Sequence, residues 1–169
     1  MNKFITVILV TLFATCQSDK EVGESKCPLH WVDGTEYGLG CIYFHHLESM
    51  PWIKARDFCK SQNSSYLVEI FTQEQQDFIV QEIIENEFIS GVERFWWIGL
   101  TDILEEGRFL WSHSLKEPTY TSWYSGDPDG EENQNAVSIE KRYDYMWTDA
   151  SEESKLYPIC QFHPDGMSI

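Results

Sequence analysis

Basic residues are scarce in this chain of 169 residues. Lys and Arg number 12 against 28 Asp and Glu, which gives a formal net charge of -16 at pH 7. Such a field repels the phosphate backbone that a nucleic-acid-binding protein must neutralise, so we expect no DNA or RNA partner. The acidity suits bound metal ions or basic partner surfaces instead, although an acidic surface can also serve solubility alone.

Long apolar runs are missing too, apart from one at the amino end. Residues 4–14 form an apolar run after a short basic start, and Cys16 and Ser18 are small residues suited to a cleavage site. The run falls short of the roughly 20 apolar residues of a spanning helix. We therefore expect a signal peptide over residues 1–18, an extracellular protein and no membrane insertion. Cleavage after Cys16 fits nearly as well.

The remaining chain has the length of one domain, since domains commonly hold about 100 to 200 residues. Hydrophobic residues make up 42% of the sequence and aromatic residues 15%, which is enough for a packed core. Residues 19–26 are polar and acidic and are expected to form a frayed lead-in. We place the domain at residues 27–163 and a short tail at residues 164–169.

The few cysteines and a single sequon fit an oxidising secretory compartment. Once Cys16 leaves with the signal peptide, four cysteines remain, and four allow three connectivities. They are Cys27, Cys41, Cys59 and Cys160. They lack the paired C-x-x-C spacing of a zinc site, so they predict two structural disulfides. Asn63, in the sequence Asn-Ser-Ser, is the expected glycosylation site.

Catalytic motifs are absent as well. The five His show no H-E-x-x-H spacing, and the sequence has neither a Gly-rich phosphate loop nor a G-x-S-x-G elbow. His45 and His46 would point to opposite faces of a strand, which does not suit a metal pair. We therefore expect a binding protein and not an enzyme.

The apolar periodicity predicts a hairpin and two helices. Residues 30–46 mix aromatic and Gly residues, as expected of two strands joined by a turn. The first helix has Ser49 as a candidate cap and Pro51 near its first turn, and the second starts at Thr72 with Gln75 as its capping-box partner. Further short strands are expected at residues 66–70, 95–100, 108–112, 136–139, 145–147 and 157–162.

Several motifs occur in a fixed order along residues 27–162. They include Cys27-Pro28, Trp52-x-x-Ala55-x-x-x-Cys59, Trp97-Ile98-Gly99-Leu100, Gly126-Asp127-Pro128-Asp129, Trp147-Thr148-Asp149 and Ile159-Cys160. In this combination the chain resembles the C-type lectin domain. The resemblance implies an α+β, C-type lectin-like fold with two helices, two small antiparallel sheets and a long ligand-binding loop.

The resemblance also implies how the cysteines pair. A bridge from the first helix to the last strand joins Cys59 to Cys160, and Cys27 with Cys41 matches the long form of the family. A typical member has one more bridge under the long loop, where this chain has Ala136 and Glu152. That missing crosslink is worth roughly 3 kcal/mol in the chain-entropy estimate. The loop is therefore expected to be more mobile without metal.

In the family, the long loop binds calcium and a sugar together. Calcium takes about six to eight hard oxygens, and neighbouring sugar hydroxyls can supply two of them. The ligands are two side chains flanking a cis proline, a following acid and an Asn-Asp pair. The matching positions here are Asp127, Asp129, Gln134, Thr148 and Asp149. Three carboxylates preserve the charge of a mannose-type set, whereas Thr148 is the weakest metal ligand because a hydroxyl replaces an amide oxygen.

The sugar specificity and neighbouring groups follow less directly from the resemblance. Asp127-Pro128-Asp129 is neither the mannose-type Glu-Pro-Asn nor the galactose-type Gln-Pro-Asp, although Asp129 follows the galactose-type order. Glu131 or Glu132 could replace Gln134 as a ligand. Trp123 or Tyr124 could stack on a galactose ring, with a core position as the simpler role. A second calcium site would use Asp102 and Glu106, and a solvated turn is the alternative there.

Two functions are consistent with these residues. The first is a secreted, calcium-dependent lectin, with galactose-type binding as the suggested specificity, that recognises glycans on microbial or host cell surfaces in innate defence. The second is the same fold without sugar binding, recognising a protein ligand or a mineral surface through its acidic loop. The irregular Asp127-Pro128-Asp129, Gln134 and Thr148 favour the second function, and the preserved ligand charge favours calcium binding.

Overall fold

The structure is a computed structural model that describes residues 27–90 and 95–164. The expected signal peptide over residues 1–18, the lead-in over residues 19–26 and all of the tail after residue 164 lie outside the described residues. Within those residues, no helix combines the length and apolar character needed to cross a membrane.

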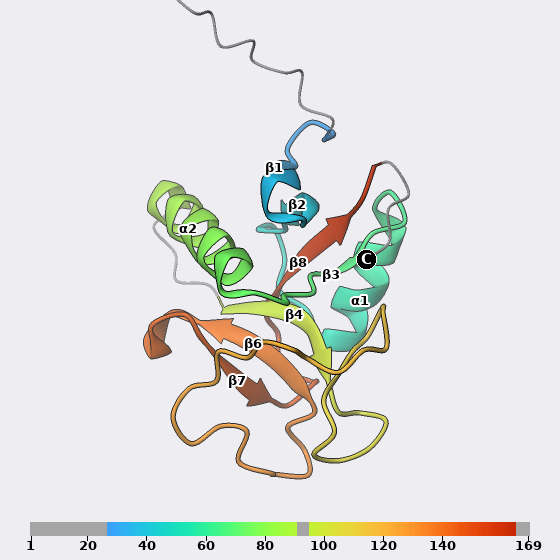
Figure 1. Ribbon diagram of the computed structural model, residues 1–169, viewed down its shortest axis with the longest axis vertical. Coiled ribbons are helices and arrows are strands. Elements are labelled where there is room, and N and C mark those ends of the chain that lie inside the picture. Colours follow the sequence, from blue (N-terminus) through green and yellow to red (C-terminus); the bar gives the residue numbers. More distant parts are fainter. Residues whose placement is uncertain (1–26, 91–94, 165–169) are drawn as a thin grey trace, which may run out of the picture.

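The described residues form one mixed sheet with two α-helices (Figure 1). The strands are β1 (Val32–Gly34), β2 (Gly40–Phe44), β3 (Tyr66–Leu67), β4 (Phe95–Thr101), β5 (Leu110–Trp111), β6 (Ala136–Glu140), β7 (Met146–Ala150) and β8 (Tyr157–Phe162). The helices are α1 (Trp52–Ser61) and α2 (Gln73–Ser90), with 3-10 turns η1 (Thr35–Tyr37) and η2 (Lys141–Tyr143). The fold is the α+β arrangement expected from the sequence.

The sheet brings the two ends of the domain together. Its strand order is β1-β2-β8-β4-β6-β7, with β3 beside β8 and β5 beside β4. Strand β2 pairs with the last strand, so that Cys41 lies opposite Phe162. All pairings between strands are antiparallel except that of β4 with β8, where Trp96 lies opposite Tyr157. This parallel pairing joins the two antiparallel parts that the resemblance implied.

Both helices begin close to their expected positions, but the cap of the first differs from the predicted one. Helix α1 has Pro51 as its N-cap, not Ser49. Ser49 is kept out of the helix because the next residue, Met50, pairs in extended form with Leu156, with backbone bonds of 2.8 and 3.2 Å. Proline suits a helix start because its missing N–H is not needed there.

The second helix starts where the capping box predicted. The backbone N–H of Gln75 donates to the Thr72 hydroxyl over 3.3 Å. The Gln75 side chain reaches back to the N–H of Phe71 over 2.7 Å, one residue earlier than in the usual box. The same side chain donates to the carbonyl of Tyr37 over 2.9 Å, which fixes α2 against the first hairpin.

Several strand boundaries differ from the predicted ones. Strand β8 has the expected bounds, whereas β3 stops at Leu67 instead of residue 70. The backbone beyond Leu67 finds other partners, since Glu69 N–H donates to the Gln161 side chain over 3.0 Å. Strand β7 extends to Ala150 and not only to residue 147. Thr148 and Asp149 therefore lie within a strand.

The core is built around tryptophan. Five Trp side chains are fully buried, at positions 52, 96, 97, 111 and 147. Buried indoles favour a partner for their N–H, and Trp52 donates to the Ile98 carbonyl while Trp97 donates to that of Met50, each over 2.9 Å. Two disulfides, Cys27 to Cys41 and Cys59 to Cys160, follow the pairing that the resemblance implied.

The long loop lies at the opposite end of the molecule from β1 and β2. In Figure 1 the chain between β5 and β6 hangs below the sheet, next to the shorter loop that follows β4. Strands β6 and β7 pair in register from Ala136 opposite Ala150 to Glu140 opposite Met146. This pair forms a firm base onto which the loop folds.

Candidate functional site

The long loop contains a cis peptide bond between Asp127 and Pro128. A turn precedes it, in which the N–H of Asp127 donates to the Tyr124 carbonyl over 3.0 Å. Gly126 and Gly130 flank the segment with φ of 112° and 76°, backbone conformations that favour glycine. Local sequence thus sets the geometry that presents Asp127 and the residue after the proline.

Asp149 on β7 connects the loop to the sheet. Its Oδ2 accepts the backbone N–H of Asp129 over 3.2 Å. Its Oδ1 is buried and has no hydrogen-bond partner among the described residues. Asp129 Oδ1 in turn accepts the N–H of Glu131 over 3.1 Å and lies 3.5 Å from Gln134 Nε2. The structure therefore brings Asp129, Gln134 and Asp149 together.

Thr148 has a different environment from these residues. Its side chain is buried, and its hydroxyl lies 3.0 Å from the hydroxyl of Ser138 on β6. Ser138 also donates to Glu140 Oε1 over 3.1 Å. Glu140 in turn forms an ion pair with Arg142. Thr148 thus belongs to a polar network that links β7 to β6.

The carboxylates of the loop disfavour one another's charge. Burial, together with the charges of Asp127 and Asp129, raises the pKa of Asp149 to about 6. Burial also raises the pKa of Asp127, with a further contribution from Asp129 and Glu140 that Arg142 partly offsets. Such shifts mark an excess of negative charge in a site partly removed from water. A bound cation would relieve this repulsion.

The carboxylates do not form a closed metal cluster. In residues 27–90 and 95–164, no three His, Cys, Asp or Glu side chains meet closely enough to hold a metal ion. The fit to calcium therefore rests on the charge and oxygen chemistry of Asp127, Asp129 and Asp149 and on the unpartnered oxygen of Asp149. The residues fit the ion in chemistry, without a preformed set of ligand distances.

An open pocket surrounds these carboxylates. Its lining includes all five carried-over positions and several residues that the sequence did not indicate: Asn133, Glu140, Arg142, Tyr143, Ala150, Ser151 and Ser154. Neither Glu140 nor Arg142 had a signal in the sequence. Glu140 reaches the pocket through the pairing of β6 with β7, and Arg142 enters through the short turn η2.

The aromatic residues divide between core and pocket. Trp123 packs edge-on against Phe109 and Trp147, with ring centroids 5.1 and 5.8 Å apart, so it has the expected core position. Tyr124 stacks on Tyr143 with centroids 4.1 Å apart. Tyr143 lines the pocket. The aromatic surface beside the carboxylates is therefore tyrosine and not tryptophan.

The residues of the expected second calcium site lie in the loop after β4. Asp102 is buried, and its Oδ2 accepts the N–H of Gly107 over 2.9 Å while its Oδ1 has no partner among the described residues. Desolvation and the charges of Asp102 and Glu132 raise the pKa of Glu106. The bond to Gly107 supports the turn that was the alternative interpretation.

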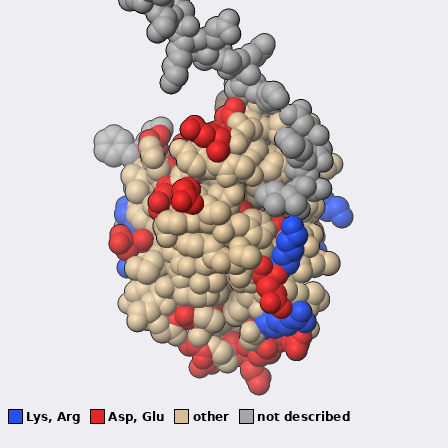
Figure 2. Space-filling view, viewed as in Figure 1, with Lys and Arg blue, Asp and Glu red and all other residues tan. Residues whose placement is uncertain are grey.

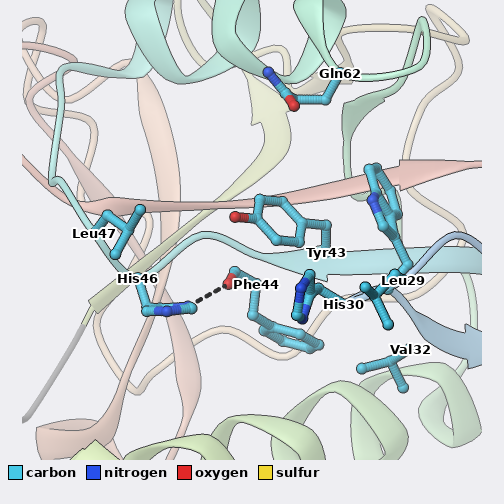
Figure 3. Close-up of a pocket in the computed structure, with 9 residues that line it drawn as sticks. Leu29, His30, Val32, Tyr43, Phe44, His46, Leu47 and Gln62 are labelled. Carbon is cyan, nitrogen blue, oxygen red and sulfur yellow. Dashed lines mark hydrogen bonds between the residues drawn. The ribbon is translucent and has the colours of Figure 1, made fainter.

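A further pocket lies at the other end of the molecule (Figure 3). Figure 3 shows Tyr43 and Phe44 of β2 at its centre, with Val32 on one side and Gln62 at the end of α1 on the other. Its walls are mostly apolar, and the side chain of Leu47 is 78% exposed at its rim. It has no concentration of charged groups comparable to that in the long loop.

Comparison with known proteins identifies the family. The model of the lectin C-type domain matches residues 48–162. The chain therefore belongs to the C-type lectin domain family, as the motifs predicted. Proteins of this family bind carbohydrates or other partners and are not enzymes, in agreement with the missing catalytic motifs.

The relatives include proteins of different binding properties. Lithostathine of Rattus norvegicus is 29% identical over 166 residues, which is 95% of this chain and 97% of that protein. The galactose-specific lectin nattectin of Thalassophryne nattereri is 35% identical over 105 residues, covering 62% of this chain and 60% of its own. The solved structure of human lithostathine has a TM-score of 0.70 at 30% identity, over 81% of this chain and 99% of that chain.

Proposed function

We propose that the protein is a secreted, calcium-dependent lectin that binds galactose-type sugars on microbial or host cell surfaces. The observation that carries this proposal is the contact of Asp129 with Asp149, whose buried Oδ1 has no partner among the described residues. A cation at that oxygen would satisfy it and offset the repulsion that raises the pKa of Asp149.

The proposed ligands follow from the contacts of each side chain. Asp127, Asp129 and Asp149 would supply charged oxygens to calcium, and Gln134 would supply a neutral amide oxygen beside Asp129. Sugar hydroxyls would complete the coordination, donate hydrogen bonds to the carboxylates and accept a hydrogen bond from the Gln134 amide. Thr148 would act through its bond to Ser138, which holds β7 in place, and only weakly as a ligand.

Galactose-type binding is supported by three observations. Asp129 follows the order of galactose-type members, and one relative, nattectin, is named as galactose-specific. Tyr143 lies beside the carboxylates, and an aromatic ring can pack against the apolar face of a sugar. Secretion is supported by the apolar amino end, and glycosylation by the exposed position of Asn63.

A second function is favoured by a specific feature of the pocket. Arg142 lines it and pairs with Glu140, so a cation of the chain itself already lies among the acids. Such a pocket could recognise a protein or a mineral surface without bound calcium. The two functions differ in their need for the metal.

Thermal unfolding with calcium and with excess EGTA separates the two functions. A site with calcium at 100 times its dissociation constant stabilises the fold by about 2.7 kcal/mol. We expect the midpoint to rise by several degrees with calcium in the wild type and not in Asp149→Asn. Asp77→Asn on the exposed side of α2 is the matched control and should retain the full rise.

The sugar is then tested on immobilised galactose and mannose. We expect retention on galactose that EGTA reverses and that Asp149→Asn abolishes. A calcium-dependent midpoint without retention on either sugar would retain the metal site and reject the lectin function. A thermal midpoint that does not change with calcium would reject both the metal site and the lectin function. It would favour the protein or mineral ligand.

A further inference from the structure

A polar pocket lies beside α1, separate from the long loop. Its lining consists of Arg56, Asp57 and Lys60 on the helix, Ser64, Ser65 and Tyr66 after it, and Ser112 and His113 beyond β5. Two basic side chains, Arg56 and Lys60, thus line one pocket in a chain whose net charge is -16.

The walls of this pocket are held by buried hydrogen bonds. Ser65 is buried and donates its hydroxyl to the Cys59 carbonyl over 2.6 Å, which fixes the chain as it leaves α1. Glu69, which is 3% exposed, accepts the backbone N–H groups of His113 and Ser114 over 3.0 and 2.9 Å. The two sides of the pocket are therefore fixed independently of any ligand.

An aromatic stack joins the two sides. The Tyr66 and His113 rings are nearly parallel, with an angle of 6° and centroids 3.7 Å apart. The stack holds the exposed imidazole of His113 at the mouth of the pocket. Burial and the nearby Glu69 raise the pKa of Tyr66, so its hydroxyl keeps its proton and can donate a hydrogen bond.

The charged side chains leave a positive excess. Arg56 pairs with its neighbour Asp57 over 2.8 Å, and this pair is largely neutral as a unit. Lys60 follows Arg56 by one helical turn and forms no ion pair with any residue in the described part of the chain. Its ammonium group, with the hydroxyls of Ser64 and Ser112, offers several donors to one small anion.

The acidity of the whole molecule limits the kind of anion. At physiological salt the Debye length is about 8 Å, so distant acids are screened while charges inside the pocket act at close range. A polyanion would extend past this range into the field of the remaining acidic residues. A singly charged group on an otherwise neutral molecule meets the pocket cations without that repulsion.

We propose that this pocket binds the sulfate ester of a sugar, with Lys60 as the charged contact and Arg56, Ser64, Ser112 and His113 as further hydrogen-bond donors. A sulfate ester has a single negative charge and three free oxygens, which suits donors that converge from a helix and a loop. The site does not use the long loop, so its binding is independent of calcium.

Asn63 affects how this site is tested, because it directly precedes Ser64 at the pocket wall. A glycan on Asn63 would stand next to the pocket and could shield it. The experiment therefore uses the full mature chain with Asn63→Gln, in 1 mM EGTA, so that neither the glycan nor calcium contributes.

The probes are galactose 6-sulfate, unsulfated galactose and inorganic sulfate, followed by the NMR signals of the His113 ring and the Tyr66 amide. We expect saturable shifts with galactose 6-sulfate and none with galactose at the same concentration. Lys60→Gln with Arg56→Gln should weaken binding at least tenfold, and Lys60→Arg should retain it. Lys54→Gln, which removes one positive charge from the same helix outside the pocket, should alter affinity less than twofold, whereas Lys60→Gln alone, with the same charge change, should weaken binding clearly more.

Three results would overturn the proposal. The first is that galactose 6-sulfate causes no shift. The second is that Lys54→Gln weakens binding as much as the double variant does. The third is that inorganic sulfate binds with the same affinity as galactose 6-sulfate, which would reject the sugar as part of the ligand. The EGTA condition keeps this result apart from the calcium-dependent function, since Asp149→Asn should leave the sulfate response unchanged.

Discussion

Asp149 is the buried carboxylate on which the charges of the long loop act most strongly. Its side chain is 7% exposed, and one of its oxygens is satisfied by Asp129 N–H while the other has no partner among the described residues. Its pKa is raised to about 6 in the fold, above the value near 3.8 of the unfolded chain. The stability linked to this group is therefore present below pH 3.8 and lost as the pH rises through 6.

This raised pKa predicts that protons compete with calcium. At pH 5 most Asp149 is protonated in the metal-free protein, so calcium must displace a proton, whereas at pH 7 the carboxylate is already ionised. We expect the calcium-induced rise in the thermal midpoint to be clearly smaller at pH 5 than at pH 7, and equal at pH 7 and 8. Scanning calorimetry at the three pH values checks this. Equal rises at pH 5 and 7 would contradict the role of Asp149.

At the scale of elements, the disulfides should differ in their effect on stability. Cys59 and Cys160 join α1 to β8 across 101 residues, and Cys27 and Cys41 close a segment of 14. In the chain-entropy estimate these loops correspond to about 4.7 and 3 kcal/mol. Replacing the first pair by Ala should therefore lower the free energy of unfolding more, as measured by urea denaturation. An equal or larger loss for the second pair would show that loop length does not govern the effect.

Element positions were predictable where local sequence decides them. Thr72 and Gln75 predicted the start of α2, and both side chains make capping bonds there. Distant partners decided the other boundaries: Met50 pairs with Leu156 and keeps the predicted cap Ser49 outside α1. The pocket of the long loop follows the same division. Asp127, Asp129 and Asp149 were predicted from sequence motifs. Arg142 lies in the turn η2, for which the sequence has no motif.

At the scale of the whole molecule, negative charge is spread over an otherwise ordinary fold. The five buried Trp and the two disulfides hold the domain together. The 28 acidic residues, with only 12 basic residues to offset them, repel one another. Acidic side chains gather at the lower edge of the molecule in Figure 2, and in the loops there the charges of neighbouring acids raise the pKa of Asp127, Asp149 and Glu106. Metal-free protein should thus be destabilised by its own charge, and calcium is only one way to reduce this.

Salt should stabilise the metal-free protein for the same reason. Raising NaCl from 0.1 to 1 M shortens the Debye length from about 10 to about 3 Å and weakens repulsion between neighbouring acids. We expect the thermal midpoint in EGTA to rise by several degrees. The matched control carries Glu106→Gln, Glu131→Gln and Glu132→Gln, exposed changes that remove three negative charges from the loop end. Its rise with salt should be smaller than that of the wild type, because less repulsion is left to screen. A wild-type midpoint that falls with salt, or an equal rise in both proteins, would show that repulsion at the loop end does not limit stability.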